Sequence, residues 1–256
     1  MAAPTVVVFD FDRTIIDGDS DNWVVVEMGL TQLFHQLRPT MPWNSLMGKT
    51  VHEIADCLKR VPLHPRIIAA IKGAHAFGCD LRIVSDANQF FIETILEHHG
   101  LLGCFSEIIT NPTFADEEGR LRIFPYHVLN STPHGCRLCP SNLCKNGGRR
   151  FIYLGDGNGD YCPTLKLIEG DHVMPRRNFP LWERIRSNPM LIKAEVHEWV
   201  DGEELEKVLG CLINCISAEE NISSSDSNPL NPSDCKFQAM PDLPHEAVPQ
   251  SLPVPH

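Results

Sequence analysis

The stretch Val6-Val7-Val8-Phe9-Asp10-Phe11-Asp12-Arg13-Thr14 sets a short apolar run directly before two carboxylates. Apolar runs that are rich in β-branched residues and end in charge are typical of buried parallel strands, and open α/β sheets bind ligands at the carboxyl ends of such strands. Asp10 and Asp12 alternate with Phe11, so both would lie on one face of an extended backbone. Because close carboxylates repel each other, they indicate a bound divalent cation or a carboxyl group with a raised pKa. The alternative is a pair of surface aspartates that water solvates.

The composition is that of an ordinary globular protein. The chain has 256 residues, of which 43% are hydrophobic and 21% are charged. It can therefore bury a sizeable core and is long enough for one domain with a smaller accessory part. Its formal net charge of −11 argues against nucleic acid or an anionic membrane as the main partner. Small anionic substrates remain compatible with this charge, since a local metal ion can reverse the field.

The sequence carries no signal for a membrane or for export. No stretch approaches the roughly twenty apolar residues that a membrane helix needs. Residues 1–5 lack the basic and apolar parts of a signal peptide. We therefore expect a cytoplasmic protein, in which the ten cysteines would mostly be free thiols or metal ligands.

Two helical patterns follow the acidic turn that comes after the first strand. Apolar residues recur at helical spacing over residues 22–37 and again over residues 50–61, where Thr50 and Glu53 have the spacing of a capping box. A connection that contains proline joins the two patterns. We expect residues 22–62 to form a small helical cap, inserted after the first strand and standing over the carboxyl end of the sheet.

Helix and strand patterns alternate over most of the remaining chain, as in βαβ units. The predicted helices cover residues 65–77, 89–99 and 203–216, and the predicted strands cover 81–84, 107–111 and 151–154, with a small hairpin that ends in 121–124. The fold class is therefore α/β, with residues 1–21 and 63–216 forming a Rossmann-like core around a parallel sheet. Residues 217–256 are rich in serine, asparagine and proline, so this tail is predicted to be disordered.

Polar clusters follow three of the apolar strands, which would bring distant residues to one edge of a parallel sheet. The clusters are Asp10-Phe11-Asp12, Ser85-Asp86, and Gly155-Asp156-Gly157 with Asp160. Asp10 and Asp156 would form an oxygen-only site of the kind that suits Mg²⁺. Ser85 and Lys145 would add a hydroxyl donor and a fixed positive charge. A metal, a donor and a cation are what a transferring phosphoryl group needs around its oxygens.

In this order, these motifs resemble the haloacid dehalogenase (HAD) superfamily of phosphohydrolases. In detail they are similar to the phosphoethanolamine/phosphocholine phosphatase family, above all to its plant branch of phosphate-starvation-induced phosphatases and inorganic pyrophosphatases. The resemblance rests on residues 10–21, 85–88, 139–145 and 155–163 and extends from residue 6 to about residue 216. It implies the HAD fold, with a Rossmann-like core and a cap.

The resemblance implies a chemical role for four residues. Asp10 would be the nucleophile that attacks phosphorus and becomes an aspartyl phosphate. Asp12 would protonate the leaving group and then activate the hydrolytic water. Ser85 and Lys145 would hold the phosphoryl oxygens.

It also implies a Mg²⁺ site made by Asp10, Asp156 and the backbone carbonyl of Asp12. Asp160 would orient the lysine or a water on the metal.

Two further carboxylates are not needed for the phosphate itself. In a family member, Asp21 and Asp86 would bind a cationic amine head group. The alternative for Asp21 is that it caps the helix that follows it.

A cysteine-rich segment allows two interpretations. His134, Cys136, Cys139 and Cys144 have a spacing like that of zinc ligands. Since a second Cys-x-x-Cys pair is absent, a structural zinc and free thiols both remain open.

The chain departs from the resembled family in length, and this leaves two functions to weigh. Related proteins carry more residues between Met47 and Gly48 and between Lys145 and Phe151. The first hypothesis is a Mg²⁺-dependent phosphatase that hydrolyses phosphoethanolamine, phosphocholine or inorganic pyrophosphate through an aspartyl phosphate. The alternative is a shortened variant with weakened catalysis that binds a phosphorylated ligand or a protein partner.

Overall fold

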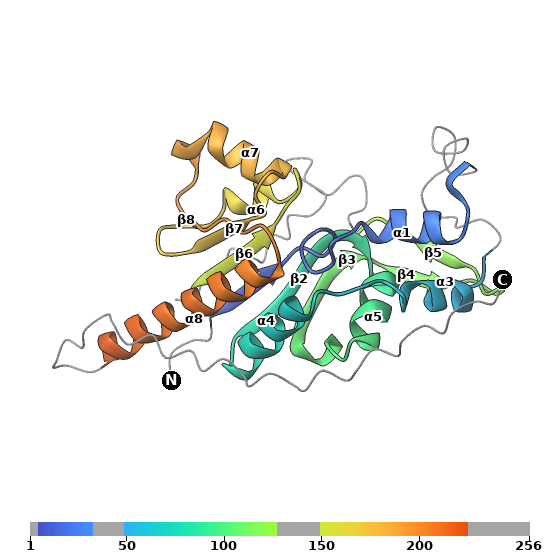
Figure 1. The fold of residues 1–256 in the computed structure, drawn as a ribbon, viewed down its shortest axis with the longest axis horizontal. Coiled ribbons are helices and arrows are strands. Elements are labelled where there is room, and N and C mark those ends of the chain that lie inside the picture. The colour runs from blue at the N-terminus through green and yellow to red at the C-terminus, as the bar shows by residue number, and fades with distance from the viewer. Residues whose placement is uncertain (1–4, 33–48, 127–148, 225–256) are drawn as a thin grey trace, which may run out of the picture.

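A computed structural model describes residues 5–32, 49–126 and 149–224. Its centre is a six-stranded sheet in the order β3-β2-β1-β6-β7-β8, with every neighbouring pair parallel (Figure 1). The strands are β1 (Val6–Phe9), β2 (Asp80–Asn88), β3 (Phe105–Asn111), β6 (Phe151–Gly155), β7 (His172–Pro175) and β8 (Glu195–Val196). The predicted α/β class and parallel sheet are confirmed.

Strand β1 lies in the middle of the sheet, between β2 and β6. All four of its residues are buried, because helices cover both faces of the sheet. Val7 and Phe9 belong to the apolar core on one face, and Val6 and Val8 belong to the core on the other. The unbroken apolar run is thus a strand that packs on both sides, as parallel strands do.

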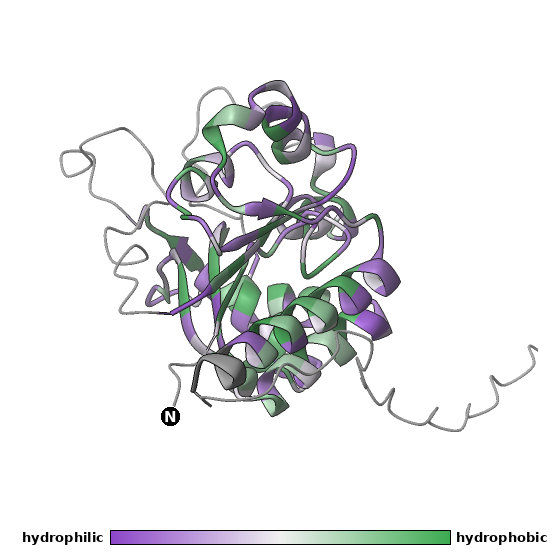
Figure 2. Cartoon of the chain, turned by 90° about the vertical axis from the view of Figure 1, so that its left-hand side faces the viewer, coloured by the Kyte–Doolittle hydropathy of each residue, from purple (hydrophilic) through white to green (hydrophobic). Residues whose placement is uncertain are grey.

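The two faces of the sheet carry different sets of helices. The core around Val7 and Phe9 is covered by α1 (Ser20–Glu27), α3 (Val51–Leu58), α4 (Pro65–Ala76), α5 (Gln89–His98) and α8 (Gly202–Ser224). The short helices α6 (Tyr161–Thr164) and α7 (Pro180–Ser187) cover the other face. Figure 1 shows α4 and α8 side by side, and Figure 2 shows apolar residues concentrated on the strands between helices that carry both apolar and polar residues.

Smaller elements complete the fold. Strands β4 (Thr113–Ala115) and β5 (Leu121–Ile123) pair in an antiparallel hairpin, as predicted. Two 3₁₀ helices lie at Leu102–Cys104 and Pro189–Leu191. Among the described helices, none combines the length and the apolar character that a bilayer span requires.

Glycine in the left-handed region ends several helices. Gly78 and Gly100 have positive φ angles and follow α4 and α5, as predicted from their positions. Gly29 does the same after α1: its φ is 68°, its N–H donates to the Val26 carbonyl, and the N–H of Leu30 donates to the Val25 carbonyl. The single helix predicted over residues 22–37 is therefore wrong, because this C-cap ends α1 at Glu27.

Other boundaries also differ from prediction. The capping box at Thr50 and Glu53 is present at the start of α3. Strand β2 is longer than the predicted 81–84, and α8 continues past the predicted end at residue 216 to Ser224. Residues 33–48 of the expected cap and residues 225–256 of the expected tail lie outside the described residues. The elements from α6 to β8 carried no pattern that predicted them.

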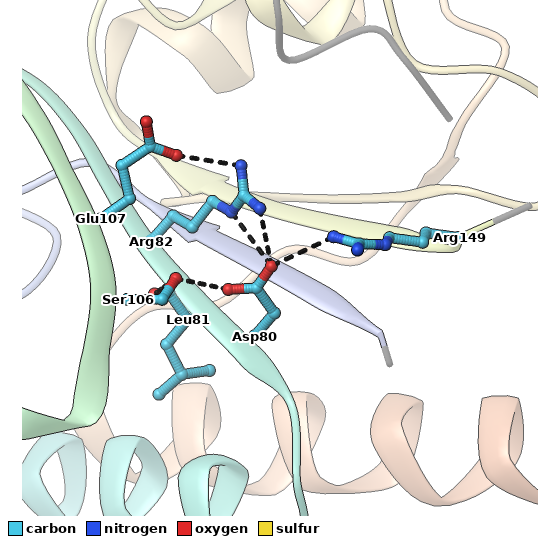
Figure 3. A network of polar contacts seen from close by, with 6 residues as sticks. All are labelled: Asp80, Leu81, Arg82, Ser106, Glu107 and Arg149. Atoms are coloured by element: carbon cyan, nitrogen blue, oxygen red, sulfur yellow. Dashed lines mark hydrogen bonds and ion pairs between the residues drawn. The ribbon is translucent and has the colours of Figure 1, made fainter. Parts of the chain in front are cut away.

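A polar network holds the sheet together at the amino end of β2 (Figure 3). The carboxylate of Asp80 accepts hydrogen bonds from Arg82 Nη2 at 2.7 Å, from Arg149 Nη1 at 3.3 Å and from the Ser106 hydroxyl. Arg82 also donates to Glu107 of β3 at 3.0 Å. Although burial opposes it, hydrogen bonding by Arg82 and Ser106 lowers the pKa of Asp80. One carboxylate therefore links β2, β3 and the residues that lead into β6.

Replacing Asp80 with alanine tests this link. We expect Asp80→Ala to lower the free energy of unfolding by about 2 kcal/mol, because two arginines lose a charged acceptor. Urea unfolding measures the change. Asp56→Ala is the control, since Asp56 forms only exposed ion pairs on α3 and should change stability by less than about 0.5 kcal/mol. Equal losses in the two variants would contradict the proposed role of Asp80.

Candidate active site

The register of the sheet brings three carboxylates together. Asp10 follows β1 and Asp156 follows β6, and the N–H of Asp10 donates to the Leu154 carbonyl at 2.9 Å. Ligand oxygens of Asp10, Asp156 and Asp160 all lie within 4.8 Å of one another, and all three residues are buried. The structure thus brings together the ends of β1 and β6, as expected for adjacent parallel strands.

Asp160 is held in place by its own loop. One carboxylate oxygen accepts from the Tyr153 hydroxyl at 2.7 Å, and the other accepts from the N–H groups of Gly157 at 2.7 Å and Asp156 at 3.1 Å. A Cβ on Gly155 would lie 2.5 Å from Asp160 Cγ, so only glycine allows this approach. The role predicted for Asp160 was to orient Lys145 or a water, and its contacts within the described residues are with this loop.

The three carboxylates are electrostatically unfavourable as a group. Burial, together with the charges of Asp160 and Asp156, raises the pKa of Asp10 well above its usual value. Burial also raises the pKa of Asp156, and it raises the pKa of Asp160 to about 7. A divalent cation would remove this repulsion, and carboxylate oxygens are the ligands that Mg²⁺ prefers. The donor set therefore fits a hard divalent metal ion.

Asp12 has a different environment from Asp10. Its carboxylate accepts from the N–H of Ser20 at 2.9 Å and from the Ser20 hydroxyl at 3.2 Å, at the start of α1. Burial raises the pKa of Asp12 to about 7, although the Ser20 hydrogen bonds oppose this. A carboxyl group with a pKa near neutrality can both donate and accept a proton. Sequence reasoning missed Ser20, although it stands in the acidic turn between Asp19 and Asp21.

Three more aspartates surround Asp12. Burial and the charges of Asp12 and Asp19 raise the pKa of Asp21 to about 8. Burial also raises the pKa of Asp86, which follows Ser85 in β2. The alternative role for Asp21 is wrong, because Asp19 caps α1 by accepting from the N–H of Asn22 at 2.9 Å.

Of the remaining predicted residues, the structure describes Ser85 but not Lys145 or the cysteine-rich segment. Ser85 is fully buried near the carboxyl end of β2, and its hydroxyl oxygen accepts from the N–H of Ala87 at 3.3 Å. Its proton is therefore available to donate. Lys145 lies outside the described residues, as does the cysteine-rich segment with His134, Cys136, Cys139 and Cys144.

Most of the aspartates described above line a cleft of about 460 Å³, whereas Ser85 and Asp21 are not among its lining residues. Its described lining contains six aspartates and a single arginine, together with Gly157, Asn158, Gly159, Phe179 and Pro180; the charged residues are Asp10, Asp12, Asp19, Asp86, Asp156, Asp160 and Arg13. Such a surface repels an anion, so a phosphate group needs added positive charge in order to bind.

Arg13 and its support were not predicted. Arg13 adopts a left-handed backbone conformation with φ of 57° and forms an ion pair with Asp19 at 3.1 Å. Arg176, just after β7, donates to the Arg13 carbonyl at 2.6 Å and to Asp17 at 2.8 Å. The Arg176 guanidinium also lies over the ring of Trp199. These contacts join segments far apart in the chain, so no local sequence signal indicates them.

Comparison with known proteins agrees with this geometry. The sequence matches the family described as Putative Phosphatase over residues 5–213. It is 58% identical over 243 residues to a thiamine phosphate phosphatase-like protein of Arabidopsis thaliana, covering 86% of this chain and 99% of that protein. It is 52% identical over 267 aligned positions to inorganic pyrophosphatase 2 of the same plant, covering 95% of each chain. A HAD family hydrolase of Salmonella enterica has the same fold, with a TM-score of 0.51 at 14% identity over 71% of this chain and 66% of that one.

The parallel sheet, with aspartates beyond the carboxyl ends of β1 and β6, has the fold of that hydrolase. The chain belongs to the Putative Phosphatase family, and the enzyme class and branch predicted from its motifs are confirmed. The alignment with the pyrophosphatase has more positions than this chain has residues. That relative therefore carries residues without a counterpart here.

The contact between Gly155 and Asp160 yields a matched pair of variants. Gly155→Ala would drive a methyl group into Asp160, so we expect a loss of about 1 to 3 kcal/mol in unfolding free energy and the loss of phosphate release. Gly157→Ala is the control, since its Cβ would meet Asp160 Oδ2 at an ordinary 3.5 Å. Urea unfolding and a phosphate assay measure both effects. Equal behaviour of the two variants would show that Asp160 tolerates displacement.

The raised pKa of Asp12 links stability to pH. An acid whose pKa is higher in the folded chain keeps a proton that the unfolded chain releases, so its contribution to stability falls as pH rises from about 4 to about 7. In metal-free protein we expect Asp12→Asn, which cannot ionise, to gain on the wild type over this range by on the order of 2 kcal/mol. Urea unfolding in EDTA at several pH values gives the difference. A difference that does not depend on pH would argue against a raised pKa.

Proposed function

We propose that this protein is a Mg²⁺-dependent phosphatase that hydrolyses small phosphate compounds through an aspartyl phosphate on Asp10. The observation that carries the proposal is the unlike placement of the two aspartates at the end of β1. Asp10 shares a buried group with Asp156 and Asp160, whereas the carboxylate of Asp12 is bonded to Ser20. This difference supports a metal-binding role for Asp10 and a proton-transfer role for Asp12.

The proposed metal site uses Asp10, Asp156 and the backbone carbonyl of Asp12. When bound, Mg²⁺ would supply positive charge to the phosphoryl oxygens and so offset the acidic lining of the cleft. Asp160 would fix the loop that carries Asp156, since two of its hydrogen bonds come from N–H groups of that loop.

Each chemical step is assigned to a residue of this chain. A carboxylate oxygen of Asp10 attacks phosphorus, and the bond from phosphorus to the leaving oxygen breaks while Asp12 gives that oxygen its proton. Asp12, now ionised, takes a proton from a water molecule as the water oxygen attacks the aspartyl phosphate. This second displacement releases inorganic phosphate and restores both carboxyl groups.

Two residues would hold the phosphoryl group during these steps. The Ser85 hydroxyl can donate a hydrogen bond, since its oxygen already accepts from the backbone. Lys145 would supply the fixed positive charge that the described lining lacks, apart from Arg13.

The acidic cleft supports a substrate class. Asp19 and Asp86 line the cleft, and Asp21 lies close enough to feel the charges of Asp12 and Asp19. Together these aspartates would attract a cationic leaving group, as in phosphoethanolamine or phosphocholine. The relatives include a thiamine phosphate phosphatase-like protein, which also fits a cationic leaving group, and an inorganic pyrophosphatase. Pyrophosphate would instead depend on Arg13 and the metal to screen these aspartates.

The net charge of −11 argues against nucleic acid and membranes as partners. We propose a cytoplasmic location.

A single assay tests the activity and ranks the substrates. Purified protein with Mg²⁺ is given phosphoethanolamine, phosphocholine, thiamine monophosphate or pyrophosphate, and released phosphate is measured. We expect Asp10→Asn to lower the rate by at least about a thousandfold, because the nucleophile is lost. EDTA should abolish the wild-type rate. Asp56→Asn, on the exposed side of α3, should leave it unchanged.

The outcomes separate the two hypotheses. Equally slow release by wild type and Asp10→Asn would reject the enzyme and favour a protein that binds a phosphorylated ligand. Release that is dominated by pyrophosphate would remove the amine-binding role from Asp21 and Asp86.

A further inference from the structure

A second group of metal-ligand side chains lies at the edge of the sheet. His172 is the first residue of β7, Glu195 is the first residue of β8, and His197 follows β8. His172 Nδ1 is 3.2 Å from His197 Nε2 and 3.8 Å from a carboxylate oxygen of Glu195, and His197 Nε2 is 3.5 Å from that same oxygen. Two imidazole nitrogens and one carboxylate oxygen thus form a small triangle.

The backbone places these side chains on one face of the strand pair. His172 lies opposite Glu195 in the parallel register, and His197 is two positions further along the same strand direction. The N–H of Glu195 donates to the Asp171 carbonyl and the N–H of His197 to the Val173 carbonyl, both at 2.9 Å. Main-chain hydrogen bonds therefore fix all three positions before any ligand binds.

The triangle has the dimensions of a zinc site. With zinc bonds of about 2.0 to 2.2 Å to nitrogen and oxygen and tetrahedral angles, two ligand atoms lie about 3.3 to 3.6 Å apart. The three observed separations, 3.2, 3.5 and 3.8 Å, bracket this value. Imidazole nitrogens select Zn²⁺ and similar transition metals, whereas Mg²⁺ and Ca²⁺ prefer oxygen ligands alone.

Access and charge also fit a bound cation. The side chain of His172 is only 10% exposed, His197 is 29% exposed and Glu195 is 67% exposed, so the group has a buried base and an open side. A water molecule can enter from that open side as the fourth ligand. With neutral imidazoles, the carboxylate leaves one negative charge for the metal to neutralise.

The group is distinct from the phosphatase cleft. His172 pairs with Ile152 at the start of β6, whereas Gly155, next to Asp156, pairs with Pro175 at the other end of β7. Three residues of strand separate the two positions, or roughly 10 Å. Figure 1 shows β8 beyond β7 at the edge of the sheet.

We propose that His172, Glu195 and His197 form a structural Zn²⁺ site that ties the edge strand β8 to β7. The ion would join two strands of which β8 has only two residues, which is the kind of short edge that gains from an added cross-link. This site is independent of the proposed hydrolysis and of the Mg²⁺ ligands.

The test measures Zn²⁺ binding by the full-length protein. Metal-stripped protein is titrated with Zn²⁺ in competition with a chromophoric chelator, with millimolar Mg²⁺ present to occupy the carboxylates of the cleft. We expect His197→Ala to lose one Zn²⁺ per chain, or to bind it at least a hundredfold more weakly, and Glu195→Gln to weaken it by about tenfold. His52→Ala is the control, since His52 is exposed on α3 and should leave binding unchanged.

Two further measurements show whether the bound Zn²⁺ is held by these three residues or by cysteines. Cys139→Ser should keep this Zn²⁺, which separates it from any ion held by the cysteine-rich segment. Zinc X-ray absorption of wild type loaded with one equivalent should show nitrogen and oxygen neighbours near 2.0 to 2.1 Å and no sulfur near 2.3 Å; this holds even if His197→Ala fails to fold. Equal Zn²⁺ binding by wild type and His197→Ala, loss of the ion in Cys139→Ser alone, or a sulfur shell would overturn the proposal and leave a direct hydrogen bond between the two imidazoles.

Discussion

Repulsion among Asp10, Asp156 and Asp160 is the constraint on which the rest of the site depends. In the parallel register Phe9 lies opposite Leu154, so Asp10 and Asp156, each directly beyond its strand, cannot separate without breaking the register. Asp160 cannot turn away either, because Tyr153 and two N–H groups hold its carboxylate. The fold therefore maintains a concentration of negative charge that only protons or a cation can relieve. The backbone hydrogen bonds thus maintain a donor set that fits a divalent cation.

The same constraint explains why the two aspartates of the opening stretch differ. Asp10 directly follows β1, whereas beyond it the chain turns and brings Asp12 to the start of α1. There the carboxylate of Asp12 accepts hydrogen bonds from the N–H and the hydroxyl of Ser20. A single turn of the chain thus gives two identical side chains different partners: Asp10 groups with Asp156 and Asp160, and Asp12 is bonded to Ser20. The position of α1 is in turn supported by the hydrogen bond from the Trp23 indole to the Cys57 carbonyl of α3.

The sequence predicts those elements whose patterns act on residues close by in the chain. The run Val6 to Phe9 and the glycines at 78 and 100 act through their immediate neighbours, and these predictions are confirmed. Gly29 carried the same signal, but the apolar spacing around it favoured a longer helix. Strand β7 begins with His172 and ends with Pro175, and β8 has only two residues, so neither shows the apolar run that marks β1. Strand β7 depends on pairing with β6, and β8 depends on pairing with β7, rather than on their own sequences.

The site shows the same division. The aspartates at the ends of β1 and β6 could be found because an apolar strand precedes each of them, and the parallel rule brings such ends together. Arg13, Ser20 and Arg176 could not, because each matters through a partner that only the folded chain brings near it. Arg176 shows this most clearly, because it follows β7 and donates a hydrogen bond to the carbonyl of Arg13, 163 residues away in the chain. A residue distant in the chain therefore stabilises the left-handed conformation of Arg13. Arg13 is the one cation in the described lining of the cleft, and its position depends on Arg176, which follows β7. Strand β7, which the sequence did not predict, thus determines through Arg176 where the positive charge of Arg13 lies among the aspartates. That position would affect how the cleft binds a phosphate.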